Sequence, residues 1–170
     1  SGRVTFNERW ARMLGLSLDE VAQDIGFWEE RVHPEDLPRV RAQLEPHLRG
    51  ETAHYACEHR LRHKDGRWVW VLDAGRVLER DAQGRPLRAA GIHLDITERK
   101  RAEHALLAEE ARLERIIETM AEGLVTIDAE GRFTMANAAA AQILGQPRER
   151  IVGRRNVEVV PRRYDLDGAP

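Results

Sequence analysis

Two sets of side chains alternate between residues 55 and 62: Tyr55, Cys57, His59 and Leu61 stand between Ala56, Glu58, Arg60 and Arg62, which are small or charged. A period of two is typical of a β-strand with one buried face. Lys64-Asp65-Gly66 is a strong hairpin signal, because glycine tolerates the positive φ that such turns need. With a second turn at 81–84 and further strands over 67–78 and 86–96, the pattern predicts a three-stranded antiparallel meander.

Short helices are predicted before this sheet. Apolar residues recur at spacings of three and four over 7–15, which favours a short amphipathic helix. Ser17 and Glu20 have the spacing of a capping box. A longer helix is predicted over 34–48, with two internal prolines as points where it would break or kink. Short helices beside an antiparallel sheet place the chain in the α+β class.

A third pattern begins near Thr97, which is a plausible N-cap, because no glycine or proline follows until Gly123. Apolar residues fall at a and d positions of a heptad, with Glu109 as the polar exception, and charged residues fill most other positions. The pattern predicts one continuous helix over 98–121 that pairs with its twin in a homodimer. Its predicted dimer residues are Ala102, Leu106, Leu113, Ile116 and Met120.

The beginning of the chain is repeated near its end. Residues 2–7, followed by Leu14 and Gly15, reappear as residues 131–137, followed by Leu144 and Gly145, with the same interval from the asparagine to the Leu-Gly pair. Such a repeat indicates a tandem domain. We therefore expect a first domain over 1–97, a linker helix over 98–121, and the amino-terminal half of a second domain over 122–170.

Composition and charge indicate which binding partners and which cellular compartment to expect. The 170-residue chain has a net charge of −2, which gives no electrostatic reason to expect nucleic acid as a partner. No apolar run approaches the roughly 20 residues that span a bilayer, so we expect no membrane contact by this region. A single cysteine excludes an internal disulfide framework and fits a reducing compartment. We expect a cytoplasmic location, although the parent protein could be membrane-associated.

Several phrases resemble the PAS family of sensory domains. Short helices followed by a three-stranded meander are similar to the later part of that fold, and His33-Pro34-Glu35-Asp36 is similar to a phrase of one large subgroup. The segments that resemble the carboxy-terminal PAC signature are Glu58-x-Arg60-Leu61, Lys64-Asp65-Gly66, Trp70-Val71, Gly91 and the run Asp95-Ile96-Thr97-Glu98-Arg99-Lys100.

The resemblance also implies that both copies of the domain are incomplete. The first copy begins at the second strand of the usual five-stranded sheet, and the second copy ends before its sheet can be completed. An open strand edge exposes a row of hydrogen-bonding groups. We expect these edges to be covered by another chain or by residues 123–135.

The sequence predicts no catalytic or metal site. His54, Cys57, His59 and His63 are close in sequence, but strand alternation turns His54 away from Cys57 and His59. No flavin-thiol or haem motif is present, so the cofactor, if any, is unknown. His104 lacks the surroundings of a histidine-kinase phosphoacceptor. No nucleophile lies beside a plausible base, so we expect no enzyme activity in this region.

Two groups of residues are functional candidates. Tyr55, Cys57, Trp68 and Trp70 could line a small-molecule pocket, although core packing explains each of them as well. Glu58 and Arg60 share a strand face and are expected to form an ion pair. Asp95, Ile96 and Thr97 join the last strand to the linker helix, where we expect them to cap the helix and to relay a signal.

Two functions remain open. In the first, a signal or small ligand perturbs the sheet, and the dimeric linker helix relays the change to a downstream histidine kinase or diguanylate cyclase. The alternative is a ligand-free scaffold for protein interaction and dimerisation.

Overall fold

A computed structural model describes residues 4–159, and the chain divides into two compact units between Glu103 and His104. Among the described residues, no helix is long and apolar enough to cross a membrane.

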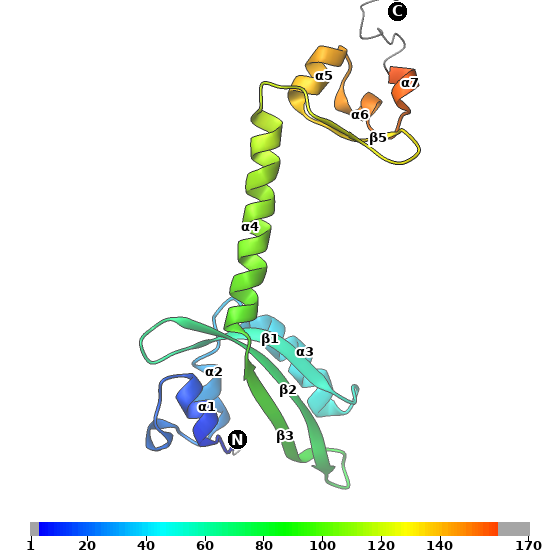
Figure 1. Cartoon of the computed structure of the whole chain (residues 1–170). Helices are drawn as coiled ribbons and strands as arrows, with labels where there is room; N and C mark the ends of the chain where they lie inside the picture. The colour runs from blue at the N-terminus through cyan, green and yellow to red at the C-terminus, as the bar shows by residue number, and fades with distance from the viewer. Residues whose placement is uncertain (1–3, 160–170) are drawn as a thin grey trace, which may run out of the picture. The chain divides into compact units, whose positions relative to one another are not determined.

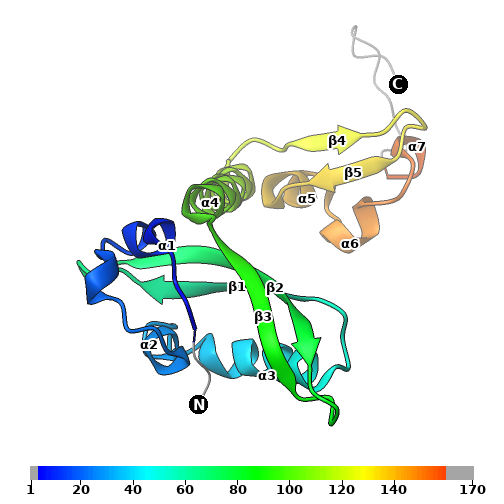
Figure 2. The ribbon, with the colours of Figure 1, turned by 90° about the horizontal axis from the view of Figure 1, so that it is seen from below.

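The first unit has the predicted α+β composition (Figure 1). Its sheet has the order β1-β2-β3, and both pairings are antiparallel, which confirms the meander. The helices precede the strands in the chain, and Figure 2 shows them gathered beside the sheet. The elements are α1 (Glu8–Met13), a 3₁₀ turn (Leu18–Glu20), α2 (Ile25–Glu29), α3 (Leu37–Arg49), β1 (Tyr55–Arg62), β2 (Trp68–Arg80) and β3 (Pro86–Asp95).

Local signals explain most helix ends in this unit. The Asn7 side chain accepts a hydrogen bond from the Trp10 amide, and the capping box of Ser17 and Glu20 is formed. Helix α3 starts at Leu37, three residues later than predicted, with a proline in its first turn, where the missing N–H is tolerated. Pro46 lies inside α3 without ending it, and the helix stops at Gly50, whose φ is 88°.

The core of the first unit lies between the helices and one face of the sheet, which we call the inner face. Strand β1 presents every second residue to it, and the four from Tyr55 to Leu61 are buried. Val69 and Val71 of β2 are also buried there. The helical and loop side chains in the same buried cluster are Phe6, Trp10, Ala11, Leu14, Val21, Trp28, Val32 and Val40.

A single residue, Ile96, separates β3 from helix α4 (Thr97–Thr119), which runs without a break. The prediction of an uninterrupted helix is therefore confirmed. It ends two residues earlier than predicted, so Met120 lies just beyond its last turn. The helix includes residues on both sides of the boundary between the units.

The second unit carries two short strands, β4 (Val125–Ile127) and β5 (Phe133–Ala136), which pair with each other. Three short helices follow: α5 (Ala138–Leu144), α6 (Arg148–Ile151) and α7 (Asn156–Val159). The helix of the repeat is alike in both copies, because Asn137 caps α5 as Asn7 caps α1, and φ is 70° at Gly15 and 63° at Gly145. The residues before the asparagine differ, since 133–136 form β5 and 4–7 form no strand. The predicted stretch 160–170 lies outside the described residues. The predicted domain limits and the cover for the open strand edges stay predictions.

Candidate functional site: a sheet–helix junction and a buried histidine cluster

The junction between β3 and α4 is held by three hydrogen bonds. The Asp95 Oδ1 accepts from the Thr97 amide at 2.8 Å, and the Thr97 Oγ1 accepts from the Trp70 amide at 3.0 Å. The amide of Ile96, itself buried, donates to the Trp70 carbonyl at 2.9 Å. The junction residues are thus bonded to β2 as well as to one another.

This geometry corrects the expected role of Thr97. The β2–β3 ladder ends at the pair Val71 and Asp95, so the next amide of β2, that of Trp70, needs another acceptor. The Thr97 hydroxyl supplies it. Asp95, rather than Thr97, satisfies a free amide at the start of the helix.

Ion pairs tie the first turn of α4 to β1. Glu58 pairs with Arg99, and its second carboxylate oxygen lies 2.9 Å from the Lys100 Nζ. Hydrogen bonds from Lys100 first, and then from Arg99, lower the pKa of Glu58. The Lys100 ammonium also lies 5.4 Å from the centre of the Trp70 ring.

The expected ion pair between Glu58 and Arg60 is therefore replaced by two longer-range pairings. Arg60 reaches the buried Asp36, with its Nε 2.9 Å from Oδ2 and its Nη2 3.1 Å from Oδ1. Neither partner was visible in the sequence, because 24 residues separate Asp36 from Arg60 and 41 separate Glu58 from Arg99.

The four pocket candidates lie on two different faces of the sheet. Tyr55 and Cys57 are buried on the inner face. Trp70 is opposite Arg60 in the strand register, and Trp68 is opposite Arg62, which places both tryptophans on the other face. A single pocket cannot be lined by all four, because successive side chains of a strand point to opposite sides.

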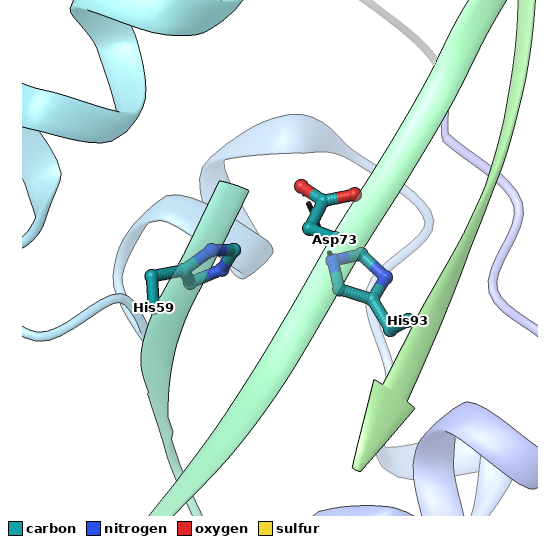
Figure 3. Close-up of side chains that lie close together, drawn as sticks. All are labelled: His59, Asp73 and His93. Atoms are coloured by element: carbon teal, nitrogen blue, oxygen red, sulfur yellow. Dashed lines mark ion pairs between the residues drawn. The ribbon is translucent and has the colours of Figure 1, made fainter. Parts of the chain in front are cut away.

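The inner face instead carries a cluster that sequence reasoning did not assemble: His59 from β1, Asp73 from β2 and His93 from β3 (Figure 3). One potential ligand atom from each residue lies within 4.8 Å of the others. Asp73 is directly opposite His93 in the register, and the His93 Nε2 lies 3.5 Å from the Asp73 Oδ2. The expectation of no metal site is not tested by this arrangement.

His59 is the most unusual member of the cluster. It is fully buried, and neither ring nitrogen has a hydrogen-bond partner among the described residues. Burial lowers its pKa to about 4, so the ring is neutral near pH 7. An unpartnered buried polar atom costs about 1–3 kcal/mol, so this arrangement calls for a partner of another kind.

The sequence contains a signal for this cluster, namely the positions of its two hairpin turns. The two hairpin turns determine the register of β1, β2 and β3, and that register brings residues 59, 73 and 93 onto one face. Grouping histidines by closeness in sequence joined His59 to His54 and His63 instead. In the structure, the His63 Nδ1 lies 2.8 Å from an oxygen of its neighbour Asp65.

The predicted dimer residues of α4 form an exposed apolar stripe. Leu106, Leu113 and Ile116 are 62%, 50% and 47% exposed, and no residue of α4 is buried. Ala102 is exposed on the same helix, and Met120 follows its end.

The Asn137 side chain makes four hydrogen bonds within the second unit. Its side chain is buried, and its Oδ1 accepts from the amides of Leu124 and Ala140, each at 2.9 Å. Its Nδ2 donates to the carbonyls of Ile117 and Glu122, each at 2.9 Å. Beside it is an apolar hollow of about 380 Å³ lined by Gly123, Val125, Ile127, Phe133, Ala140, Ile143, Leu144 and Asn156.

Comparison with known proteins agrees with this architecture. The chain is 33% identical over 150 residues to the two-component sensor PprA of Pseudomonas aeruginosa, covering 88% of this chain and 16% of that protein. It is 32% identical over 127 residues to a protein of Escherichia coli named "Probable diguanylate cyclase DgcE", covering 74% of this chain and 11% of that protein. The chain therefore spans less than a fifth of either relative.

A crystal structure of a sensory box histidine kinase/response regulator from Burkholderia thailandensis has a TM-score of 0.56 and 32% identity, covering 64% of this chain and 79% of that one. A family model described as PAS fold matches residues 3–93, and one described as PAS domain matches residues 111–169. The chain therefore belongs to the PAS family of sensory domains, with one match in each of its two units.

Proposed function

We propose that this chain is a sensory relay in which a change in the first sheet is passed through α4 to an effector farther along the parent protein. The observation that carries the proposal is the direct hydrogen bonding of β2 to Thr97, the first residue of α4, and to Ile96, the residue before it. A shift of β2 must move these residues or break buried hydrogen bonds, because no flexible loop separates sheet from helix.

The relay acts through a homodimer whose two α4 helices pair along the exposed apolar stripe. Leucine and isoleucine at a and d positions favour such pairing, since the stripe is otherwise left in water. A relay needs two arrangements of the helix pair that differ by only a few kcal/mol, so that a signal can shift their populations. The resemblance to sensor proteins favours a histidine kinase or a diguanylate cyclase as the effector. A cytoplasmic location remains our prediction.

Adjacent leucines provide a matched test of pairing. Leu106 lies on the stripe and Leu107 does not, although they are 62% and 56% exposed. Leu106→Glu should convert a dimer to monomer in sedimentation velocity, while Leu107→Glu should leave it unchanged. A monomeric wild-type chain, or equal effects of both variants, would refute pairing along this stripe.

The relay itself is tested in the full-length parent. Asp95→Ala should change effector output more than twofold while the unfolding transition of the first unit is retained. Asp81→Ala is the control, because Asp81 also accepts backbone amides, those of Gln83 and Arg85, but at the distant β2–β3 turn. Unchanged output in a folded Asp95→Ala protein would contradict the coupling.

A ligand-free scaffold is the second candidate, and the filling of the inner face by aromatic side chains favours it. The Trp28 ring lies 5.7 Å from that of His59, and the Trp10 ring 6.1 Å from that of His93. Native mass spectrometry of the purified chain separates the two functions. A bound small molecule would support the sensor, and a dimer without a bound molecule would support the scaffold.

A further inference from the structure

We propose that His59, Asp73 and His93 form a binding site for a divalent transition-metal ion inside the first unit. The three residues come from three neighbouring strands, so the sheet itself holds them in place. Figure 3 shows the two rings and the carboxylate turned toward a common region. The proposal concerns the first unit alone and does not depend on the relay.

The donor set fits this class of ion. Neutral imidazole suits zinc, nickel, iron and copper, and a carboxylate adds charge compensation. Two ligands at about 2.0–2.1 Å from a tetrahedral ion are roughly 3.3 Å apart. The 3.5 Å between the His93 Nε2 and the Asp73 Oδ2 is close to that value. His59 has to approach by at most about 1.5 Å, since all three ligand atoms already lie within 4.8 Å.

Burial supplies the independent reason to expect a ligand. His59 is completely buried, and both of its ring nitrogens lack a hydrogen-bond partner among residues 4–159. The buried His47 is different, because its Nδ1 lies 2.9 Å from the Thr52 carbonyl and its Nε2 accepts from the Val77 amide. A bound metal ion would give one ring nitrogen of His59 a partner.

The edge of the cluster lies nearer to solvent than its centre. The side chains of Asp73 and His93 are 14% and 16% exposed, whereas the His93 Nε2 itself is buried, so an ion would enter on their side only with a small movement of these side chains. Three protein ligands leave a fourth position for water or for a small anionic molecule. A metal ion here would place a charge on the inner face of the sheet, next to all three strands.

The test is a titration of the whole, chelator-treated chain with Zn²⁺, followed by isothermal calorimetry and by thermal unfolding. We expect one high-affinity ion per chain and a rise in Tm. Asp73→Asn, which preserves shape, and His93→Gln should each weaken binding at least about tenfold. Cys57→Ser is the matched control, since Cys57 faces Asp73 across the strands but lies outside the cluster, and it should bind as the wild type does.

Cobalt binding to the wild-type chain gives a second readout that does not require the variants to fold. Trp10 and Trp28 lie beside the two histidine rings, so Co²⁺ bound in the cluster should quench tryptophan fluorescence in the wild type. Visible Co²⁺ absorption should report nitrogen and oxygen ligands without a thiolate band. Absence of stoichiometric binding, equal affinity in Asp73→Asn, or loss of binding in Cys57→Ser would overturn the assignment.

Discussion

Both units contain a short helix that follows a capping asparagine, α1 in the first unit and α5 in the second, but they bury it to different extents. In the first unit, α1 packs on a sheet of three long strands, and Leu14 at its end is fully buried. In the second unit, α5 accompanies two short strands, Leu144 is only partly buried, and Ile143 is 73% exposed. Helix capping is therefore a local property, whereas burial in a hydrophobic core depends on strands from elsewhere in the chain.

The capping asparagines differ in the same way. Asn7 is exposed and makes the usual cap to the Trp10 amide. Asn137 is buried and in addition connects to the end of α4 and to the loop before β4. Asn137 therefore links three segments of the second unit, whereas Asn7 bonds only within its own helix start.

The equivalent leucines should show the largest contrast. Leu14→Ala should destabilise the first unit by about 4 kcal/mol, because a fully buried leucine leaves a cavity, whereas Leu144→Ala should cost the second unit about 1 kcal/mol. All four tryptophans belong to the first unit, so fluorescence-detected unfolding reports Leu14→Ala and hydrogen exchange reports Leu144→Ala. Equal losses would break the comparison.

The asparagine pair should show a smaller contrast. Asn137→Ala removes four hydrogen bonds from a buried site and should cost about 3 kcal/mol, while Asn7→Ala should cost about 1 kcal/mol as an ordinary cap. Hydrogen exchange at the amides of Leu124 and Ala140 measures the first, and fluorescence the second. Retained protection at Leu124 in Asn137→Ala would contradict the proposed role.

Acid should act selectively on the first unit through Asp36. Burial alone would raise the pKa of Asp36, but hydrogen bonds from the Arg60 side chain and backbone outweigh it and lower the pKa to about 2. A carboxyl group with a lowered folded pKa stabilises above its unfolded pKa of 3.8, and this stability is lost as the pH falls toward 2. The expected loss is about 2 kcal/mol.

Arg60→Gln should be less stable than the wild type near pH 7, and its stability should fall less steeply between pH 4 and pH 2. Denaturant titrations followed by tryptophan fluorescence at several pH values measure both. Exchange protection in the second unit is the internal control and should not differ between the two proteins. Parallel pH curves for wild type and variant would refute the assignment to Asp36.

Periodic patterns were enough to predict the meander, the unbroken helix and the repeat. The meander and the helix depend on patterns within short segments, such as the alternation around Cys57 or the glycine-free run before Gly123, and the repeat depends on the likeness of residues 2–7 to residues 131–137. The same reasoning failed at Trp68 and Trp70, because residue type alone does not show which face of a strand a side chain occupies. It failed at Thr97 because the competing donor, the Trp70 amide, is 27 residues away.

The sequence by itself therefore determined the elements of this PAS protein: the helix caps, the strand periodicity and the heptad of α4. Only the tertiary structure decided which distant side chains meet, as His59 meets Asp73 and His93, and as Glu58 meets Arg99. The physical reason is that caps and periodicity arise from residues close together in the sequence. A contact between strands depends instead on the strand register, which is determined by both hairpin turns.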